Sequence, residues 1–230
     1  SIATYHKYGG HINQEAWSIV ENFARVVCRN WHRADHGIWE IRSAPTHFVY
    51  SKVMCWVALD RSVALARTLG LGRAQEVTEW ERTAEIIRKE VLTKGWSWRK
   101  RAFSQAYRSD HMDAANLMLP MVGFLPGEDP RVLSTIRRIR KELAKGALVR
   151  RYHTNTGVDG LPGEEGAFLM LSFWLIGALL SAGEVEEASG LFEEVPGYSN
   201  HLGLFPEMID PDTKEALGNF PQAFSHIGLI

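Results

Sequence analysis

Apolar residues recur at helical spacing along almost the whole chain. Between residues 17 and 31 they fall at positions 17, 20, 24, 27, 28 and 31, which is the spacing of one face of a helix. The same one-sided pattern returns later and predicts partly exposed helices at 73–91, 129–143 and 183–195. Other segments are apolar nearly all round, and we expect buried helices at 48–66, 113–125, 166–180 and 220–230.

Partly exposed and buried helices therefore alternate about four times along the sequence. Because successive helices usually pack together, this alternation predicts two concentric rings of helices. We expect an all-α fold, either an α/α toroid or a curved layered solenoid. The 230 residues, of which 45% are hydrophobic, are enough for the core of one domain over 1–230.

The connections between the predicted helices differ in length according to their direction. Those from a buried to an exposed helix are short, whereas those from an exposed to a buried helix span 33–45, 96–112, 150–165 and 196–219. In a ring of antiparallel pairs, the long loops should meet at the N-terminal ends of the inner helices. Long loops on a rigid scaffold often carry function. These loops hold the aromatic rings, arginines and carboxylates expected around a sugar.

Charge and composition argue against several kinds of partner. The 26 basic residues balance 27 acidic ones, so we expect neither nucleic acid nor an anionic membrane as partner. The longest apolar run, 167–180, is shorter than the roughly 20 residues that cross a bilayer. No signal peptide opens the sequence, and we expect a cytoplasmic protein. The nine histidines lack close metal-ligand spacing, so we expect no metal and no cofactor. The pattern does not predict an oligomeric state.

Two loop carboxylates, Glu40 and Glu207, are candidates for chemistry. Hydrolysis of a glycosidic bond needs two carboxyl groups, one to protonate the leaving oxygen and one on the opposite side. Glu40 stands between Trp39 and Ile41, and an apolar setting would keep a carboxyl group protonated. Glu207 lies in "LFPEM", where the proline stiffens the chain. From the residues alone, Glu40 is open to three interpretations: a helix cap, a solvated loop charge or an acid.

Four stretches, in sequence order, carry a resemblance to a known family. They are "GIWEIRSAPTHFVYSKVMCWVALDRSVALA", "DAANLMLPMVGFLPGEDPR", "LPGEEGAFLMLSFWLIGALLSAGEVEEA" and "LFPEMIDPDTKEALGNFPQAFSHIGLI". They resemble family 15 of the glycoside hydrolases, which includes glucoamylases and trehalase-like enzymes. The resemblance implies an (α/α)6 barrel and hydrolysis of terminal α-glucosidic bonds with inversion of configuration.

The resemblance also implies roles for single residues. The family's general acid, a Glu directly after Trp, corresponds to Glu40. Its general base, in a loop of the form L-P-E, corresponds to Glu207, although Phe205 precedes the proline here. A sugar-binding Arg-Tyr pair corresponds to Arg151 and Tyr152. The other candidate sugar-binding residues in the long loops are Trp39, Arg42, Glu165 and Trp98, the last being equally open to a place in the core.

The number of helices departs from the family pattern. A complete (α/α)6 barrel has six inner and six outer helices, whereas the sequence predicts about eight in all. We therefore expect the C-terminal portion of a barrel, with an N-terminal part of the same protein as partner. The expected substrate is an α-glucan oligosaccharide or trehalose, and we rank the glucoamylase-type substrate, the oligosaccharide, ahead of trehalose. The alternative is a helical toroid or inactive fragment that at most binds carbohydrate.

Overall fold

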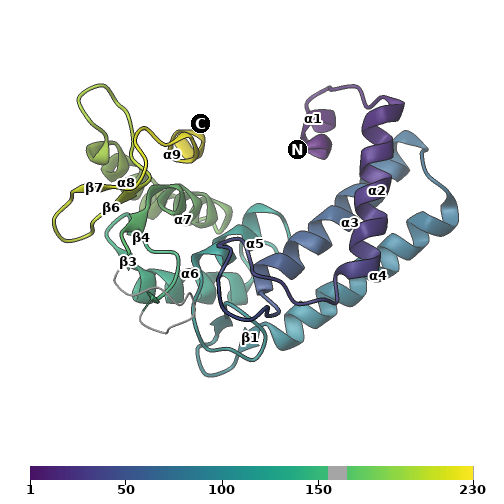
Figure 1. The fold of residues 1–230 in the computed structure, drawn as a ribbon, viewed down its shortest axis with the longest axis horizontal. Coiled ribbons are helices and arrows are strands. Elements are labelled where there is room, and N and C mark those ends of the chain that lie inside the picture. Colours follow the sequence, from purple (N-terminus) through teal and green to yellow (C-terminus); the bar gives the residue numbers. More distant parts are fainter. Residues whose placement is uncertain (155–164, 230) are drawn as a thin grey trace.

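The computed structural model describes residues 1–154 and 165–229, and helices dominate it (Figure 1). The α-helices are α1 (Ile2–Lys7), α2 (Gln14–Asn30), α3 (Val49–Leu69), α4 (Ala74–Lys94), α5 (Met118–Met121), α6 (Pro130–Leu143), α7 (Leu169–Ser181), α8 (Val185–Glu194) and α9 (Ala223–Leu229). The 3-10 turns within the described residues are η1 (Ala114–Leu117) and η3 (Val195–Tyr198). The prediction of an all-α fold is confirmed.

The strands are short and lie in the connections. They are β1 (Trp96–Ser97), β2 (Ala102–Phe103), β3 (Ala144–Lys145), β4 (Leu148–Val149), β5 (Ala167–Phe168), β6 (Met208–Ile209) and β7 (Ala216–Leu217). β1 pairs with β2 and β3 with β4, while β5, β6 and β7 form an antiparallel sheet in that order.

The helices form an arc that runs from α2, α3 and α4 at one end to α7, α8 and α9 at the other (Figure 1). The predicted inner helices α3 and α7 are buried over much of their surface. The outer helices α4 and α6 bury one stripe each, for example Trp80, Ala84, Ile87 and Val91 on α4. Asp129 caps α6 and accepts a hydrogen bond from the Arg131 N–H at 2.8 Å, with Pro130 at the first helical position. No described helix is both long and apolar enough to cross a membrane.

The buried segment 113–125 differs from the single helix that its apolar pattern predicts. It forms η1 followed by one turn of α5, and the chain leaves the helix at Gly123. Gly123 has φ +69°, the left-handed conformation that commonly ends helices. The Phe124 N–H then donates to the carbonyl oxygen of Leu119 at 3.0 Å, which closes the turn.

The first N–H of α3, of η1 and of α7 donates to a carbonyl oxygen in the next long loop, whereas the predicted buried helix over 220–230 is the short α9, in which only Ser225 is buried. The N–H of Val49 donates to Gln105 (2.9 Å), that of Ala114 to Arg151 (2.9 Å) and that of Leu169 to Glu207 (3.1 Å). Helix N-termini carry N–H groups without partners in their own helix, and the loops supply these partners. The expected meeting of the long loops is therefore observed for their described parts; residues 155–164 lie outside the described residues.

Candidate active site

Glu40 ends a tight turn in the first long loop. Its N–H donates to the carbonyl oxygen of Gly37 at 3.3 Å, and its φ is +51°, which is uncommon for a residue other than glycine. No helix begins here, because α3 starts at Val49 with Phe48 as its N-cap. The helix-cap interpretation of Glu40 is therefore wrong.

The carboxyl group of Glu40 is exposed, in contrast to its sequence neighbours. Ile41 is 2% exposed and Trp39 is half-buried. Since both neighbours turn inward, they do not enclose the carboxyl group, and the apolar setting expected from the sequence is not found in this chain.

Side chains from the loop and from α3 hold the turn in place. One carboxyl oxygen of Asp35 accepts hydrogen bonds from the N–H of Gly37 (2.7 Å) and the hydroxyl of Ser51 (2.8 Å). The N–H of Ile41 donates to the carbonyl oxygen of His36 at 2.9 Å. The turn is thus fixed to the first turns of α3.

Trp39 connects the Glu40 turn to two other loops and to α7. Its indole Nε1–H donates to Asp113 Oδ1 at 2.9 Å. Its ring lies 6.5 Å from the ring of Phe168 and 6.4 Å from that of Trp174, measured between centroids. The guanidinium of Arg151 stands 5.5 Å from the same ring, a distance at which a cation is attracted to an aromatic face.

Asp113 is a buried carboxyl group with three N–H donors. Besides Trp39, the side-chain amide of Gln105 (3.1 Å) and the N–H of Ala115 (2.8 Å) donate to it. Burial raises the pKa of Asp113, while the three donors act in the opposite direction. Asp113 therefore caps η1 and fixes the indole next to Glu40.

Arg151, Tyr152 and Glu165 lie together beside the Glu40 turn. Arg151 forms a two-point ion pair with Glu165, with Nε 3.1 Å from Oε2. The same guanidinium stands 5.5 Å from the ring of Tyr152. Tyr152 is 4% exposed and belongs to the apolar cluster of Ile41, against which Trp39 packs. The Tyr152 ring therefore packs against the buried side of the Glu40 turn, in the cluster of Ile41.

Glu207 precedes β6 and stands at the start of α7. Its carbonyl oxygen accepts the first N–H of α7, and its own N–H donates to the carbonyl oxygen of Asn219 at 2.9 Å. The side chain is half-buried. Its Oε2 accepts two hydrogen bonds from Asn219, from the backbone N–H (2.9 Å) and from Nδ2 (2.8 Å).

A short series of contacts joins the two carboxylates. Trp39, next to Glu40, contacts Phe168 of β5, and Phe168 is the register partner of Met208, next to Glu207. The loop of Glu40 and the strand of Glu207 thus lie on either side of one aromatic contact at the N-terminal end of α7.

Trp98 and Arg42 are not joined to this group. Trp98 is 84% exposed, so the interpretation as a core residue is wrong. Its ring contacts Trp96 at 6.4 Å, and its hairpin is tied to outer helix α6 by the ion pair of Lys100 with Glu142 (2.7 Å). Arg42 is exposed after the turn. In residues 1–154 and 165–229, no hydrogen bond or ring contact connects either side chain with Trp39 or Glu207.

Sequence reasoning missed Asp113 and Asn219 as parts of the site. Asp113 carries a cap signal, since it precedes small residues at a predicted helix start, but that pattern says nothing about Trp39. Asn219 follows glycine, a pair typical of turns. Only the three-dimensional structure brings their side chains to the two candidate groups.

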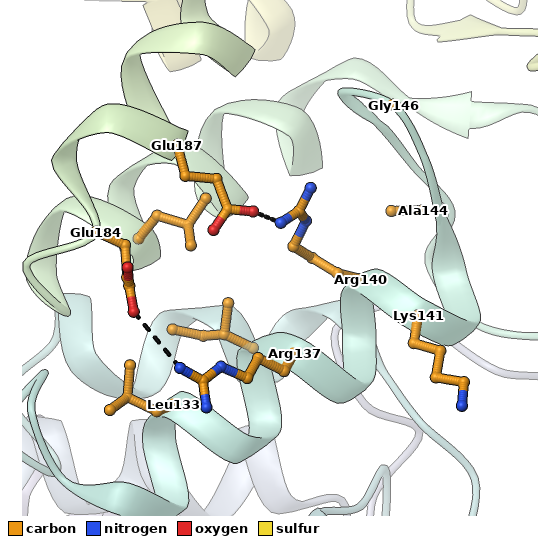
Figure 2. Close-up of a pocket in the computed structure, with 10 residues that line it drawn as sticks. Leu133, Arg137, Arg140, Lys141, Ala144, Gly146, Glu184 and Glu187 are labelled. Atoms are coloured by element: carbon orange, nitrogen blue, oxygen red, sulfur yellow. Dashed lines mark ion pairs between the residues drawn. The ribbon is translucent and has the colours of Figure 1, made fainter.

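The cavity of about 360 Å³ between α6 and α8 lies outside this group (Figure 2). The charged side chains that line it form ion pairs with each other, Arg137 with Glu184 (3.6 Å) and Arg140 with Glu187. None of the candidate site residues lines it. The candidate active site is therefore the group around Trp39, Glu40 and Glu207.

Comparison with known proteins identifies the family of this chain. The family model described as "Glycosyl hydrolases family 15" matches residues 1–230. The chain belongs to glycosyl hydrolases family 15. Proteins named trehalase are similar to it over its whole length, with 42% identity for Thermoplasma volcanium and 40% for Mycolicibacterium smegmatis. The resemblance seen in the sequence is thus confirmed.

The family's solved structures agree with the fold. A bacterial glucoamylase complexed with acarbose matches 92% of this chain and 36% of its own, with a TM-score of 0.79 and 13% identity. At this identity the match shows the fold alone, that of the (α/α)6 barrel of the family. The chain spans about a third of the length of the relatives it matches, 36% and 34% for the two trehalases.

Proposed function

We propose that this chain carries both catalytic carboxyl groups of an inverting α-glucoside hydrolase that acts on trehalose. Glu40 is the general acid and Glu207 the general base. The observation that carries the proposal is the contact of Trp39 with Phe168, which holds the two carboxylate-bearing segments beside each other at the start of α7.

The surroundings of the two carboxyl groups fit these different roles. Two N–H groups donate to Oε2 of Glu207, and they fix the direction of the carboxylate, as a base that must reach a bound water requires. Glu40 is exposed on a turn of uncommon backbone conformation. Local strain of this kind costs about 1–3 kcal/mol and often occurs at functional sites.

The reaction follows from these roles. Glu40 donates its proton to the glycosidic oxygen while the bond from that oxygen to the anomeric carbon breaks. Glu207 accepts a proton from a water molecule that attacks the anomeric carbon from the opposite face. An inverting pair needs a separation of roughly 6.5–9.5 Å to leave room for this water. One glucose unit leaves as the β anomer, and the other keeps its configuration.

Trehalose is favoured over starch-type oligosaccharides by the named relatives. Those at 40–42% identity are trehalases, whereas glucoamylases enter through structures at 10–13% identity. From the sequence, we rank glucoamylase-type specificity before trehalose, and the proposal reverses that order. Arg151 and Glu165, paired beside Trp39, are the charged groups that we expect to bind glucose hydroxyls.

We also propose that the chain works together with an N-terminal part of its protein. The relatives are about three times as long as the match, and exposed apolar side chains gather near the first helices. Tyr5, Tyr8 and Phe23 are 61%, 80% and 62% exposed. Contact with further helices of a barrel would cover them.

The test is a substrate panel with product analysis by NMR. The full-length protein that contains this chain should hydrolyse trehalose faster than maltose or maltotriose. Freshly formed glucose should contain equal α and β anomers from trehalose and β-glucose alone from the attacked unit of maltose. Two α anomers from trehalose would mean retention, and binding without turnover would favour the non-catalytic alternative.

A further inference from the structure

One oxygen of the Glu207 carboxylate is held by a single residue. Asn219 donates to Oε2 through both its backbone N–H (2.9 Å) and its Nδ2 (2.8 Å), and it accepts the N–H of Glu207 at 2.9 Å. This reciprocal arrangement fixes the backbone and the side chain of Glu207 together. In the hydrogen bonds of the described residues, Oε1 of Glu207 has no protein donor.

Gly218 leaves the space that this contact needs. Its φ is +75°, a backbone conformation that residues other than glycine rarely adopt. A Cβ atom at this position would stand 2.7 Å from Oε2 and 3.0 Å from Cβ of Glu207. Glycine is therefore required on two independent grounds, and the turn can approach the carboxylate closely.

Helix α9 anchors the chain on the other side of Glu207. The hydroxyl of Ser225, which is fully buried, donates to the carbonyl oxygen of Pro206 at 2.8 Å. The N–H of Gln222 donates to the carbonyl oxygen of Phe205 at 2.9 Å, and Nε2 of His226 accepts the N–H of Phe205 at 3.3 Å. Segment 218–226 therefore holds residues 205–207 from both ends.

We propose that Asn219 is a positioning residue for the general base. It occupies Oε2 with two N–H donors, so that the ionised carboxylate presents Oε1 to the attacking water. The assignment rests on the proposed function, because it needs Glu207 as the base. Proton acceptance requires hydrogen-bond reach to the water, and a displacement of about 1 Å is enough to cost roughly 10²-fold in rate.

The main test measures kcat and KM of Asn219→Ala and Asn219→Asp on trehalose in the full-length protein. We expect kcat to fall by about 10- to 100-fold with KM changed by less than about threefold. Asn219→Asp keeps the shape but replaces the amide donor with a second carboxyl group. Asn30→Ala is the matched control, because the side chain of Asn30 donates an exposed hydrogen bond to the carbonyl oxygen of Val26 within outer helix α2. Unchanged kcat in both Asn219 variants overturns the proposal.

Azide distinguishes positioning of the base from general damage to the fold. Azide attacks the anomeric carbon without giving up a proton, so it needs no base. With α-glucosyl fluoride, fluoride leaves and β-glucosyl azide forms. We expect azide to restore part of the rate in Asn219→Ala. A rate loss that azide does not relieve means a structural role and overturns the proposal.

Two further variants separate this inference from the function on which it rests. Gly218→Ala leaves Asn219 intact but forces Glu207 to shift, and we expect a kcat loss of the same kind that azide also relieves. If Glu207→Gln keeps full activity, the assignment of the base itself is wrong. If Glu207→Gln is inactive while the Asn219 and Gly218 variants are normal, only the positioning role fails.

Discussion

The two candidate carboxylates are held in opposite ways. The Glu40 turn is fixed through its backbone and through Trp39, while the Glu40 carboxyl group itself is exposed. Glu207 is fixed through the carboxylate, with two donors on one oxygen. An acid must reach the leaving oxygen of a bound sugar, which an exposed carboxyl group allows, and a base must point one oxygen at the attacking water, which donors on its other oxygen favour. The difference in support therefore points to the difference in role.

The largest expected effect concerns the base. Glu207→Gln keeps the shape of the side chain but cannot accept a proton from water, so kcat should fall by about 10⁴-fold, the upper end of the general-base range. Because every substrate needs the water, the losses on trehalose and on α-glucosyl fluoride should be equal. Steady-state kinetics measure both. Glu215→Gln, an exposed glutamate in the same sheet region, is the control.

Glu40→Gln should give a smaller and substrate-dependent loss. We expect about 10²- to 10³-fold on trehalose, whose leaving oxygen needs a proton. The loss on α-glucosyl fluoride should be much smaller, since fluoride leaves with little help. Comparison of kcat/KM for the two substrates measures the effect, with the exposed Glu186→Gln on α8 as control. Equal losses on both substrates would remove the acid role from Glu40.

The third prediction concerns the support of Trp39. Asp113→Asn leaves at least one of three N–H donors without an acceptor, which should lower the free energy of unfolding by about 1–3 kcal/mol. Burial raises the pKa of Asp113 above its value in the unfolded chain. The stability that Asp113 contributes is then complete below the unfolded pKa, about 3.9, and falls as pH rises through the folded pKa.

The amide of the variant does not titrate, so the stability gap between wild type and Asp113→Asn should narrow with rising pH. Urea unfolding between pH 4 and pH 8 measures this gap. Asp212→Asn, which breaks only an exposed pair with Lys145, should change stability by less than about 1 kcal/mol at every pH. A gap that widens with pH would mean that the N–H donors outweigh the effect of burial.

Much of the scaffold can be predicted from the sequence, because the buried face of a helix appears as apolar residues at regular spacing. The stripe on α4 and the apolar surface of α7 follow directly from residue spacing. The helix over 113–125 could not be predicted correctly, since the left-handed Gly123 breaks a pattern that remains apolar on both sides. Periodicity measures burial and does not measure backbone conformation.

The site is less predictable than the scaffold because its contacts are long-range. Trp39 and Asp113 are 74 residues apart, and their hydrogen bond has no local signature. Glu207 and Asn219 are closer, but their contact depends on the pairing of β6 with β7. The family resemblance directs attention to Glu40 and Glu207, whereas the residues that hold them appear only when the loops are folded.

The smallest expected effect separates strain from chemistry at Glu40. Asn adopts the left-handed conformation more readily than Glu, so Glu40→Asn should raise the free energy of unfolding by up to about 1 kcal/mol. For a chain of this size, this gain in the free energy of unfolding corresponds to a rise of about 2–4 °C in Tm. The variant should also lose its activity on trehalose, because it lacks the acid. Arg101→Asn is the matched control, because Arg101 has φ +53° in the β1–β2 hairpin. It should gain similar stability and keep its activity. A fall in Tm for Glu40→Asn would show that the exposed carboxyl group stabilises its turn, and the strain at Glu40 would then no longer support a functional role.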